Sequence, residues 1–355
     1  MTEPSNHYGP TAARQHGRPG RETRPASRTI DLLAHVLVPE AAAFMAPHLK
    51  PGGEPMARFA TPESQALNRR QGVDRKEVFT THAARLAELD AMGIDMQVVA
   101  PPPGQCYVTA AAEHAVPGIR MVNDGIAAYV AGRPDRFVGL GTVPLQEPAE
   151  AVAELERCIG RLGFKGVQIL TNVAGRELSE PAFEPFWARA EALGALVMIH
   201  PNGFTEAERL RRFYFNNVIG NPLETTLALH YLIFDGVLER YPALKILAVH
   251  GGGYLPAYAG RIDHAWGARS DARGSLPKPP SHYLRKLYFD SIVFTPHQLE
   301  YLVRVYGADH VVMGTDYPFD MADSDPIGHV CAVEGFDEAT RAAICGGNAA
   351  RLLGL

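Results

Sequence analysis

The chain has 355 residues, of which 46% are hydrophobic and 21% charged, and its formal net charge is −5. This composition is ordinary for a globular protein, and the length allows one large domain of α/β-barrel size. The acidic balance argues against a nucleic-acid partner, because nucleic-acid-binding domains usually carry a basic excess. We therefore expect a small-molecule ligand, with no nucleic acid and no membrane.

The cysteines bear on the compartment. The four of them, Cys106, Cys158, Cys331 and Cys345, lie far apart in the sequence. This spacing indicates neither a disulfide framework nor a Cys-x-x-Cys metal site. A reducing cytoplasm is the expected location.

The N-terminal residues 1–28 are polar and rich in Arg, Pro, Gly and Ser. They contain no apolar stretch of the length that a secretory signal needs. We expect a disordered tail here, outside the folded domain. The domain would then span residues 29–355 as a single unit.

From residue 29 onward, apolar strand patterns alternate with helical patterns. Proline stands at several expected helix starts and glycine at several expected helix ends, which is the usual asymmetry of helix termini. Eight strands, each followed by a helical stretch, predict a (β/α)8 TIM barrel in the α/β class. The expected strands cover residues 29–35, 94–100, 136–143, 166–170, 195–200, 245–250, 286–293 and 311–315. The expected helices cover 79–92, 118–132, 148–162, 182–193, 222–240, 254–267, 296–306, 337–345 and 347–353.

The long segment at about 36–78 follows the first strand and is too rich in Pro and Gly to form one helix. In a barrel, long segments after a strand lie at the catalytic face. We expect an inserted lid-like segment that covers the site or forms one wall of it. An irregular excursion without a role is an equal alternative.

Ligand-type side chains stand at the ends of several expected strands. His200 and His250 close two apolar runs, and Asp316 follows a third. On the first strand, Asp31, Leu33 and His35 are expected on one face because strand side chains alternate, and His35 lies nearest the carboxyl end. The carboxyl ends of barrel strands meet at one mouth, so imidazoles and carboxylates there can gather one divalent metal ion. Each of these residues alone is more often structural.

The motifs at these positions resemble the amidohydrolase-related family typified by 2-amino-3-carboxymuconate-6-semialdehyde decarboxylase. The resemblance covers nearly all of residues 29–355. It is carried by Ile-Asp-Leu-Leu-Ala-His-Val-Leu-Val-Pro (30–39), Phe-Val-Gly-Leu-Gly-Thr-Val-Pro (137–144), Gly-Val-Gln-Ile (166–169), Ile-His-Pro (199–201), His-Gly-Gly-Gly-Tyr-Leu-Pro (250–256), Gly-Arg-Ile-Asp-His (260–264), Gly-Thr-Asp-Tyr-Pro-Phe (314–319) and Gly-Asn-Ala (347–349).

The resemblance implies a TIM barrel of the metal-dependent hydrolase type, a homodimer and one divalent ion, zinc or a similar metal. By position, His35, His200 and Asp316 match the family's metal ligands. His250 matches the catalytic histidine, with Asp316 able to assist from the ligand shell. Arg261 matches an arginine that reaches the neighbouring subunit's substrate carboxylate.

Two departures from the family pattern stand out. Leu33 occupies the place of the first histidine in the usual Asp-x-His-x-His, and an isobutyl group cannot bind a metal. Three ligands remain, and Mn²⁺ or Mg²⁺ becomes an alternative to zinc. Asn202 follows His200-Pro201 where the type enzyme has Trp, so we expect a different carboxylic acid as substrate, in contact with Asn202. Phe319 is expected to line the pocket, with packing as an equal alternative.

These residues predict a metal-dependent carboxy-lyase, a non-oxidative decarboxylase of an aromatic or conjugated carboxylic acid. Two alternatives stay open. The same metal site could serve a hydrolase, since a metal-bound water is also a nucleophile. A barrel that lost activity with the histidine at position 33 could still bind a ligand. An esterase is disfavoured, because the chain has no Gly-x-Ser-x-Gly motif.

Overall fold

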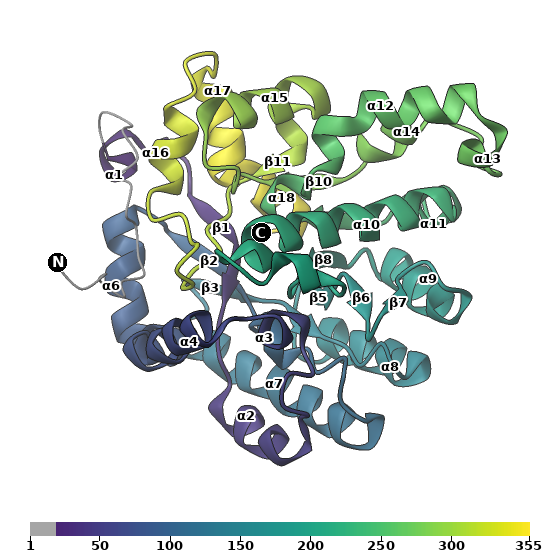
Figure 1. Cartoon of the computed structure of the whole chain (residues 1–355). Coiled ribbons are helices and arrows are strands. Elements are labelled where there is room, and N and C mark those ends of the chain that lie inside the picture. The colour runs from purple at the N-terminus through teal and green to yellow at the C-terminus, as the bar shows by residue number, and fades with distance from the viewer. Residues whose placement is uncertain (1–18) are drawn as a thin grey trace, which may run out of the picture.

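The computed structural model describes residues 19–355 and consists of parallel strands surrounded by helices (Figure 1). The eight barrel positions agree with the eight expected strands, and the third is interrupted at residue 140. Along the chain they are β1 (Ile30–His35), β2 (Met96–Ala100), β3 (Phe137–Gly139) with β4 (Gly141–Thr142), β5 (Gly166–Leu170), β8 (Leu196–His200), β9 (Lys245–Ala248), β10 (Tyr288–Asp290) and β11 (Val311–Val312). A small antiparallel hairpin, β6 (Asn172–Val173) and β7 (Arg176–Glu177), lies outside this order.

Backbone hydrogen bonds close the strands into a ring. The ladders run β1-β2-β3 and β4-β5-β8-β9-β10-β11, all parallel. At the first junction the amide of Leu140 donates to the carbonyl of Val99 at 2.9 Å. At the second, the amide of Leu32 donates to Met313 at 2.9 Å and that of His35 to Tyr317 at 2.7 Å. The predicted (β/α)8 barrel is confirmed.

The helices follow the predicted order with differences at a few breaks. The expected helix 79–92 is divided at Thr81, which has an extended backbone, and the expected helix 222–240 is divided by Gly236 at a φ of 77°. Gly93 and Gly194 end their helices in the left-handed conformation, as glycine allows. The helices are α1 (Gly20–Thr23), α2 (Pro39–Met45), α3 (Pro55–Arg58), α4 (Pro62–Asp74), α5 (Lys76–Thr80), α6 (His82–Met92), α7 (Ala112–Gly132), α8 (Pro148–Gly160), α9 (Glu184–Leu193), α10 (Asn221–Phe234), α11 (Val237–Arg240), α12 (Leu255–Ala268), α13 (Ser270–Arg273), α14 (Pro280–Leu284), α15 (Pro296–Tyr306), α16 (Pro326–Cys331), α17 (Glu338–Ala342) and α18 (Asn348–Leu353).

Two buried apolar clusters hold these layers together. The smaller cluster fills the barrel and contains Leu33, Met198 and Leu247, together with Leu352 of α18. The larger cluster lies between the strands and the helices and contains the alternate strand residues, such as Ile199. This alternation is what a barrel strand requires, and it leaves the carboxyl ends of the strands for polar side chains. Within residues 19–355, no helix combines the length and the hydropathy needed to cross a membrane.

The prediction of a disordered tail over residues 1–28 is wrong for its last part. Residues 1–18 lie outside the described residues. Gly20 of α1 is buried, and its amide donates to Asp325 Oδ1 at 2.9 Å. Arg24 forms an ion pair with Asp95, next to β2. Composition alone did not reveal these contacts, because the segment is polar and attaches largely through backbone and charged groups, with Pro25 also buried.

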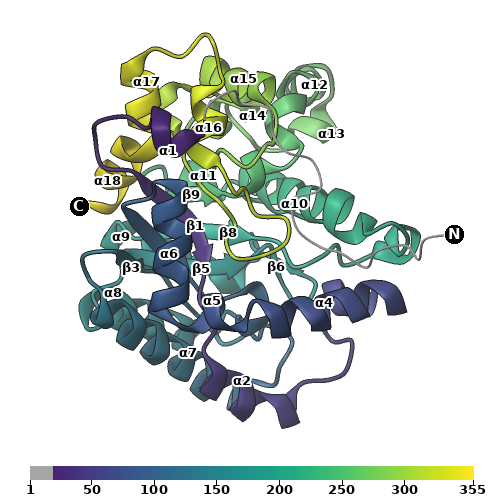
Figure 2. The same cartoon turned by 90° about the vertical axis from the view of Figure 1, so that its left-hand side faces the viewer.

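The segment 36–78 forms four short helices, α2 to α5, rather than one. Figure 2 shows α4, α5 and α6 in succession along one flank of the barrel. α3 is bound to the loop after β8: the amide of Met56 donates to the carbonyl of Asn202 at 3.1 Å, and Asn216 Nδ2 donates to the carbonyl of Pro55 at 3.0 Å. α4 is polar on all sides and buries only Gln71. The segment thus has a firmly attached part and a weakly packed part.

Candidate metal centre

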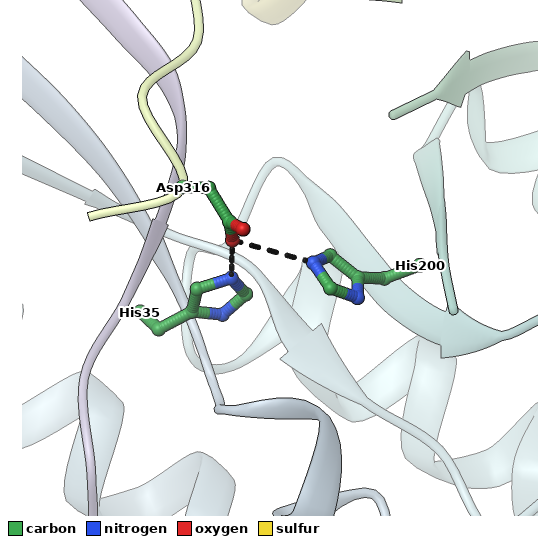
Figure 3. Close-up of side chains that lie close together, drawn as sticks. All are labelled: His35, His200 and Asp316. Carbon is green, nitrogen blue, oxygen red and sulfur yellow. Dashed lines mark hydrogen bonds and ion pairs between the residues drawn. The ribbon is translucent and has the colours of Figure 1, made fainter. Parts of the chain in front are cut away.

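Three of the predicted residues converge at the carboxyl end of the barrel. His35 ends β1, His200 ends β8, and Asp316 lies in the segment that follows β11. Asp316 Oδ1 is 2.9 Å from His35 Nε2 and 3.4 Å from His200 Nε2 (Figure 3). One ligand atom from each residue lies within 4.8 Å of the others, and all three residues are buried. The three residues that the sequence predicted as metal ligands thus lie together.

The backbone of Asp316 is held in an unusual conformation. Its φ of 61° is in the left-handed region, which a non-glycine residue adopts only when its surroundings impose it. The amide of Asp316 donates to the carbonyl of Leu33 at 2.9 Å, and the next residue pairs with β1 through Ala34 and Tyr317. The strand end of β1 thus holds the carboxylate directly over His35.

The hydrogen bonds at Nδ1 of His35 and His200 determine which ring nitrogen can bind a metal ion. His35 Nδ1 lies 3.0 Å from the carbonyl of Pro101, and His200 Nδ1 lies 2.7 Å from that of Pro201. A carbonyl only accepts, so each Nδ1 carries a hydrogen. In the neutral ring each Nε2 then keeps the lone pair that can bind a metal ion beside Asp316. Two such imidazoles and one carboxylate form the donor set of a catalytic divalent metal site. The residues present fit a metal ion.

His250 approaches the same carboxylate from the other side. Its Nε2 lies 3.5 Å from Asp316 Oδ2, and its ring centroid lies 5.0 Å from that of His200. Its backbone φ is 55°, again left-handed. Asp290 holds this turn, because its carboxylate accepts the amides of His250 at 2.7 Å and Gly251 at 2.9 Å.

The surroundings of Asp316, His200 and His250 shift the pKa values of these three groups in different directions. Burial alone would raise the pKa of Asp316, but the imidazoles of His200, His250 and His35 beside it hold it well below its ordinary value. Burial lowers the pKa of His200 to about 4, and the Asp316 carboxylate offsets this effect only in part. The pKa of His250 moves upward: burial lowers it, but the hydrogen bond and the charge of Asp316 outweigh burial. His200 is thus a neutral ligand-type imidazole, whereas His250 is suited to carry a proton.

A β-bulge in β1 changes the predicted arrangement of its side chains. Between Asp31 and Ala34 the pairing with β2 shifts, since two residues of β1, Leu32 and Leu33, lie opposite one residue of β2, Val98. Asp31 therefore lies beside Gln97, whose side chain also binds Arg85 of helix α6. The expectation that Asp31 shares a face with Leu33 and His35 is wrong. Asp31 lies on the helix-facing side, while Leu33 remains in the barrel core.

Asp31 nevertheless connects the two segments that carry metal-ligand candidates. Its Oδ1 accepts the amides of Leu33 at 3.1 Å and Thr315 at 3.0 Å. Its Oδ2 accepts Gln97 Nε2 at 2.7 Å and the Thr315 hydroxyl at 2.6 Å. Burial raises the pKa of Asp31 to about 7. The fully buried Arg85 donates to Gln97 and to the carbonyl of His35, so this network reaches both His35 and the neighbour of Asp316.

A cavity with two lobes opens beside the trio. The larger lobe has a volume of about 350 Å³ and the smaller one about 250 Å³. Asn217, Asn221, Asp316 and Met321 line both lobes, so the lobes meet at the carboxylate. His250 lines the smaller lobe and His200 the larger one. A bound molecule that reaches Asp316 can therefore extend in either direction.

The predicted substrate-binding residues fall into two groups. Asn202 and Phe319 line the larger lobe, and the Phe319 ring lies 5.1 Å from that of His35. Asn202 Nδ2 donates to Glu54 Oε2 at 3.0 Å, which ties it to the segment before α3. Arg261 lies on α12, is exposed, and lines neither lobe of its own chain.

Several residues of the site escaped the sequence analysis. Asp290 ends β10, so the strand-end rule that identified His200 also applied to it. Asn217 and Asn221 are at a π-helical turn, Asn216–Gly220, followed by α10, and no strand pattern marks them. Lys76 lines the larger lobe from α5, and its place in the inserted segment gave no signal.

Comparison with known proteins agrees with this fold. The amidohydrolase family profile matches residues 30–355. A 2-amino-3-carboxymuconate-6-semialdehyde decarboxylase of Dictyostelium discoideum is 38% identical over 272 residues, which are 76% of each chain. The crystal structure of 5-carboxyvanillate decarboxylase from Sphingomonas paucimobilis superposes with a TM-score of 0.82 at 27% identity, covering 92% of this chain and 99% of that one.

A third similar protein shares the fold. The dihydroxybenzoic acid decarboxylase of Polaromonas sp. JS666 was solved with bound manganese and an inhibitor. It has a TM-score of 0.75 and 24% identity, and the match covers 93% of this chain and 97% of that one, so the likeness shows a shared fold. The relatives are decarboxylases, which is the enzyme class that the sequence predicted. The chain belongs to the amidohydrolase family.

Proposed function

We propose that this protein is a metal-dependent, non-oxidative decarboxylase of an aromatic or conjugated carboxylic acid. One observation carries the proposal: His35 and His200 meet one oxygen of Asp316, and His250 meets the other. A metal held by the first three would lie beside a protonatable imidazole at the junction of two cavity lobes. The decarboxylase relatives support carbon–carbon bond cleavage over hydrolysis.

We propose one divalent ion, held by His35, His200 and Asp316. Zinc suits two imidazoles and a carboxylate, and manganese or magnesium is the alternative where carboxylate oxygen dominates. The manganese in the Polaromonas enzyme supports that alternative. When bound, the ion supplies positive charge that binds the substrate carboxylate with an adjacent oxygen and stabilises the negative charge of the transition state.

The chain's own groups then handle the proton. As the bond to the carboxylate breaks, CO2 leaves and the electron pair stays on the substrate carbon. His250 would deliver the proton from Nε2 to that carbon, because it lines the smaller lobe and its pKa is raised. Asp316 would assist by keeping the His250 ring in place. A second proton, supplied by the solvent through the smaller lobe, would then restore the protonated His250.

The residues that line the larger lobe would form the walls of the substrate site. Asn202 lines this lobe and would contact a polar substituent of the substrate. Its Nδ2 already donates to Glu54, so its Oδ1 would make this contact. Phe319 would stack against the substrate ring, beside His35. The substrate class is a small carboxylic acid, as in the relatives that bind aromatic acids or their analogues.

We further propose a homodimer in which Arg261 contacts the substrate carboxylate of the neighbouring subunit. Tyr254, Tyr258 and Arg261 lie four and three residues apart at the start of α12 and share one helical face. The two tyrosines are 37% and 59% exposed, so this face of α12 presents aromatic rings that a second subunit could cover. Sedimentation of the purified protein tests the dimer, and Arg261→Ala should raise KM while metal content stays unchanged.

A cytoplasmic location is proposed as well. All four cysteines are free, and Cys106, Cys158 and Cys345 are buried. Free thiols in this number are typical of a reducing compartment.

Product analysis tests the reaction. The purified protein, loaded with zinc or manganese, is given a panel of hydroxybenzoic and unsaturated dicarboxylic acids. We expect CO2 and one organic product, the acid with hydrogen in place of the carboxylate. Two organic fragments from one substrate would establish a hydrolase instead. His250→Asn is the matched variant, and it should lose CO2 release in every case where the wild type shows it.

A further inference from the structure

The strand β5 contributes none of the three metal-ligand candidates, but it carries a fully buried glutamine, Gln168. Its neighbours Val167 and Ile169 belong to the cluster between the strands and the helices, so Gln168 points into the barrel. Leu170, two residues later, pairs with His200 in the sheet. Gln168 therefore lies one layer of side chains deeper in the barrel than the proposed metal centre.

The side-chain amide of Gln168 joins the two ends of the loop that follows β2. Its Nε2 donates to the carbonyl of Pro101 at 2.9 Å and lies 3.6 Å from Cys106 Sγ. The amide nitrogen carries two hydrogens, so it can serve both partners. Residues 102–104, between these two ends, line the larger lobe of the cavity. Gln168 thus holds the base of one cavity wall from inside the barrel.

This loop depends on such an anchor because it begins with three prolines. Pro101, Pro102 and Pro103 have no backbone N–H, so none of them can donate to a neighbouring strand. The carbonyls of Pro102 and Pro103 accept amides from within the loop, three residues further on. The carbonyl of Pro101 instead accepts from other strands, namely from Gln168 on β5 and from His35 Nδ1 on β1 at 3.0 Å.

The shared carbonyl connects Gln168 to a metal-ligand candidate. The hydrogen bond from His35 Nδ1 to Pro101 orients the imidazole ring and directs Nε2 towards Asp316. The position of the Pro101 carbonyl therefore determines where His35 Nε2 lies. Outer groups that orient a metal-binding histidine change metal affinity about 10- to 100-fold when they are removed.

Stability alone does not explain a glutamine at this position. The Oε1 atom of Gln168 is buried and has no hydrogen-bond partner among residues 19–355. An acceptor left unpaired in this way costs about 1–3 kcal/mol, and an apolar side chain of similar volume would avoid that cost. The neighbouring strand offers a comparison, because Thr142 pairs with Gln168 in the sheet and its buried hydroxyl also lacks a partner in the described chain.

We propose that Gln168 is a positioning residue that clamps the loop 101–106 and thereby fixes both the His35 ring and the proline wall of the larger lobe. The inference rests on the proposed function in one respect, because it takes His35 as a metal ligand. Gln168 itself lines neither lobe. It would therefore act on metal binding only through Pro101 and His35.

Replacing Gln168 by methionine tests this, because the side-chain volume stays similar while the amide donor is lost. We expect Gln168→Met to have a free energy of unfolding in urea at or above that of the wild type, since the unpaired Oε1 is gone. Its Zn²⁺ affinity, measured by competition with a chromophoric chelator, should fall about 10- to 100-fold. A merely structural role predicts a lower free energy of unfolding and an unchanged Zn²⁺ affinity.

Thr142→Val is the matched control, since it removes a buried polar group beside Gln168 and should leave the Zn²⁺ affinity unchanged. NMR of metal-free protein with isotope-labelled histidine adds a readout that needs no metal. The ring N–H of His35 should exchange with solvent faster in Gln168→Met than in the wild type, because its acceptor is less firmly held.

Equal Zn²⁺ affinity and equal exchange in the wild type and Gln168→Met would overturn the proposal. So would a loss of affinity in Thr142→Val as large as that in Gln168→Met. A wild type that binds no Zn²⁺, but in which the exchange of the His35 ring N–H depends on Gln168, would refute the metal site and leave the positioning role intact.

Discussion

Replacing Asp31 by alanine should destabilise the barrel and weaken the metal centre together. Asp31 does not touch the metal-ligand candidates, but it binds the amide of Leu33 in β1 and both the amide and the hydroxyl of Thr315 next to Asp316. Asp31→Ala removes this connection between the two segments. The conformation of Asp316, with its φ of 61°, then loses one of its supports.

The loss of stability depends on which hydrogen-bond donors are left without an acceptor when Asp31 is replaced. Thr315 has a second acceptor, because its amide lies 3.3 Å and its hydroxyl 3.2 Å from the carbonyl of Leu33. The amide of Leu33 and the side chain of Gln97 are therefore the donors that lose their acceptor, and they account for most of the loss in the free energy of unfolding. A buried donor without an acceptor costs about 1–3 kcal/mol, so two of them cost about 2–6 kcal/mol. Typical domains have about 5–15 kcal/mol of stability, so the variant should still fold.

Urea unfolding of the wild type and Asp31→Ala, followed by elemental analysis of both, measures the two effects. We expect a loss of several kcal/mol in the free energy of unfolding and a lower metal content. Asp31→Asn keeps the side-chain volume and one acceptor oxygen. Its free energy of unfolding and its metal content should therefore lie between those of the wild type and of Asp31→Ala. If Asp31→Ala unfolds within about 0.5 kcal/mol of the wild type and binds metal equally, the argument from this network is refuted, since such small changes are typical of surface sites.

Three further predictions concern the same centre. His250→Asn should keep its metal and lose about 10²- to 10⁴-fold in turnover, whereas Asp316→Ala should lose both, as steady-state kinetics and elemental analysis will show. Leu33→His should raise metal affinity in a competition titration, with Leu33→Met as the volume control; unchanged affinity would mean that position 33 does not face the ion. Burial raises the pKa of Asp31 from 3.8 to about 7, so the folded chain retains a proton that the unfolded chain loses. The stability from this group is complete below pH 3.8 and is lost as pH rises towards 7, a trend that urea unfolding should find in the wild type and not in Asp31→Asn.

The strand-end rule explains why so much of the site was predictable. His35 and His200 each close an apolar strand, and parallel barrel strands bring their carboxyl ends to one mouth. Asp316 follows the last strand for the same reason. Sequence separation does not matter to this rule, so the sequence alone predicts that residues 281 positions apart lie together.

What the sequence did not reveal depends on local irregularity. The bulge in β1 puts Asp31 on the helix-facing side. Leu32 and Leu33 are ordinary strand residues, so the sequence does not indicate a bulge there. The packing of residues 20–28 depends on contacts such as Arg24 with Asp95, which become visible only once the barrel is formed. Lys76 lines the cavity because the segment 36–78 folds back over the barrel mouth, and periodicity gives no information on that path.

The most direct test of the central claim is elemental analysis of protein purified without added metal, combined with CO2 release measured after chelation and after return of Zn²⁺ or Mn²⁺. The account predicts about one divalent ion per chain, loss of CO2 release with the ion, and recovery on its return. A folded protein that holds no ion, and that releases no CO2 when either metal is supplied, would contradict the account and favour a barrel that only binds its ligand.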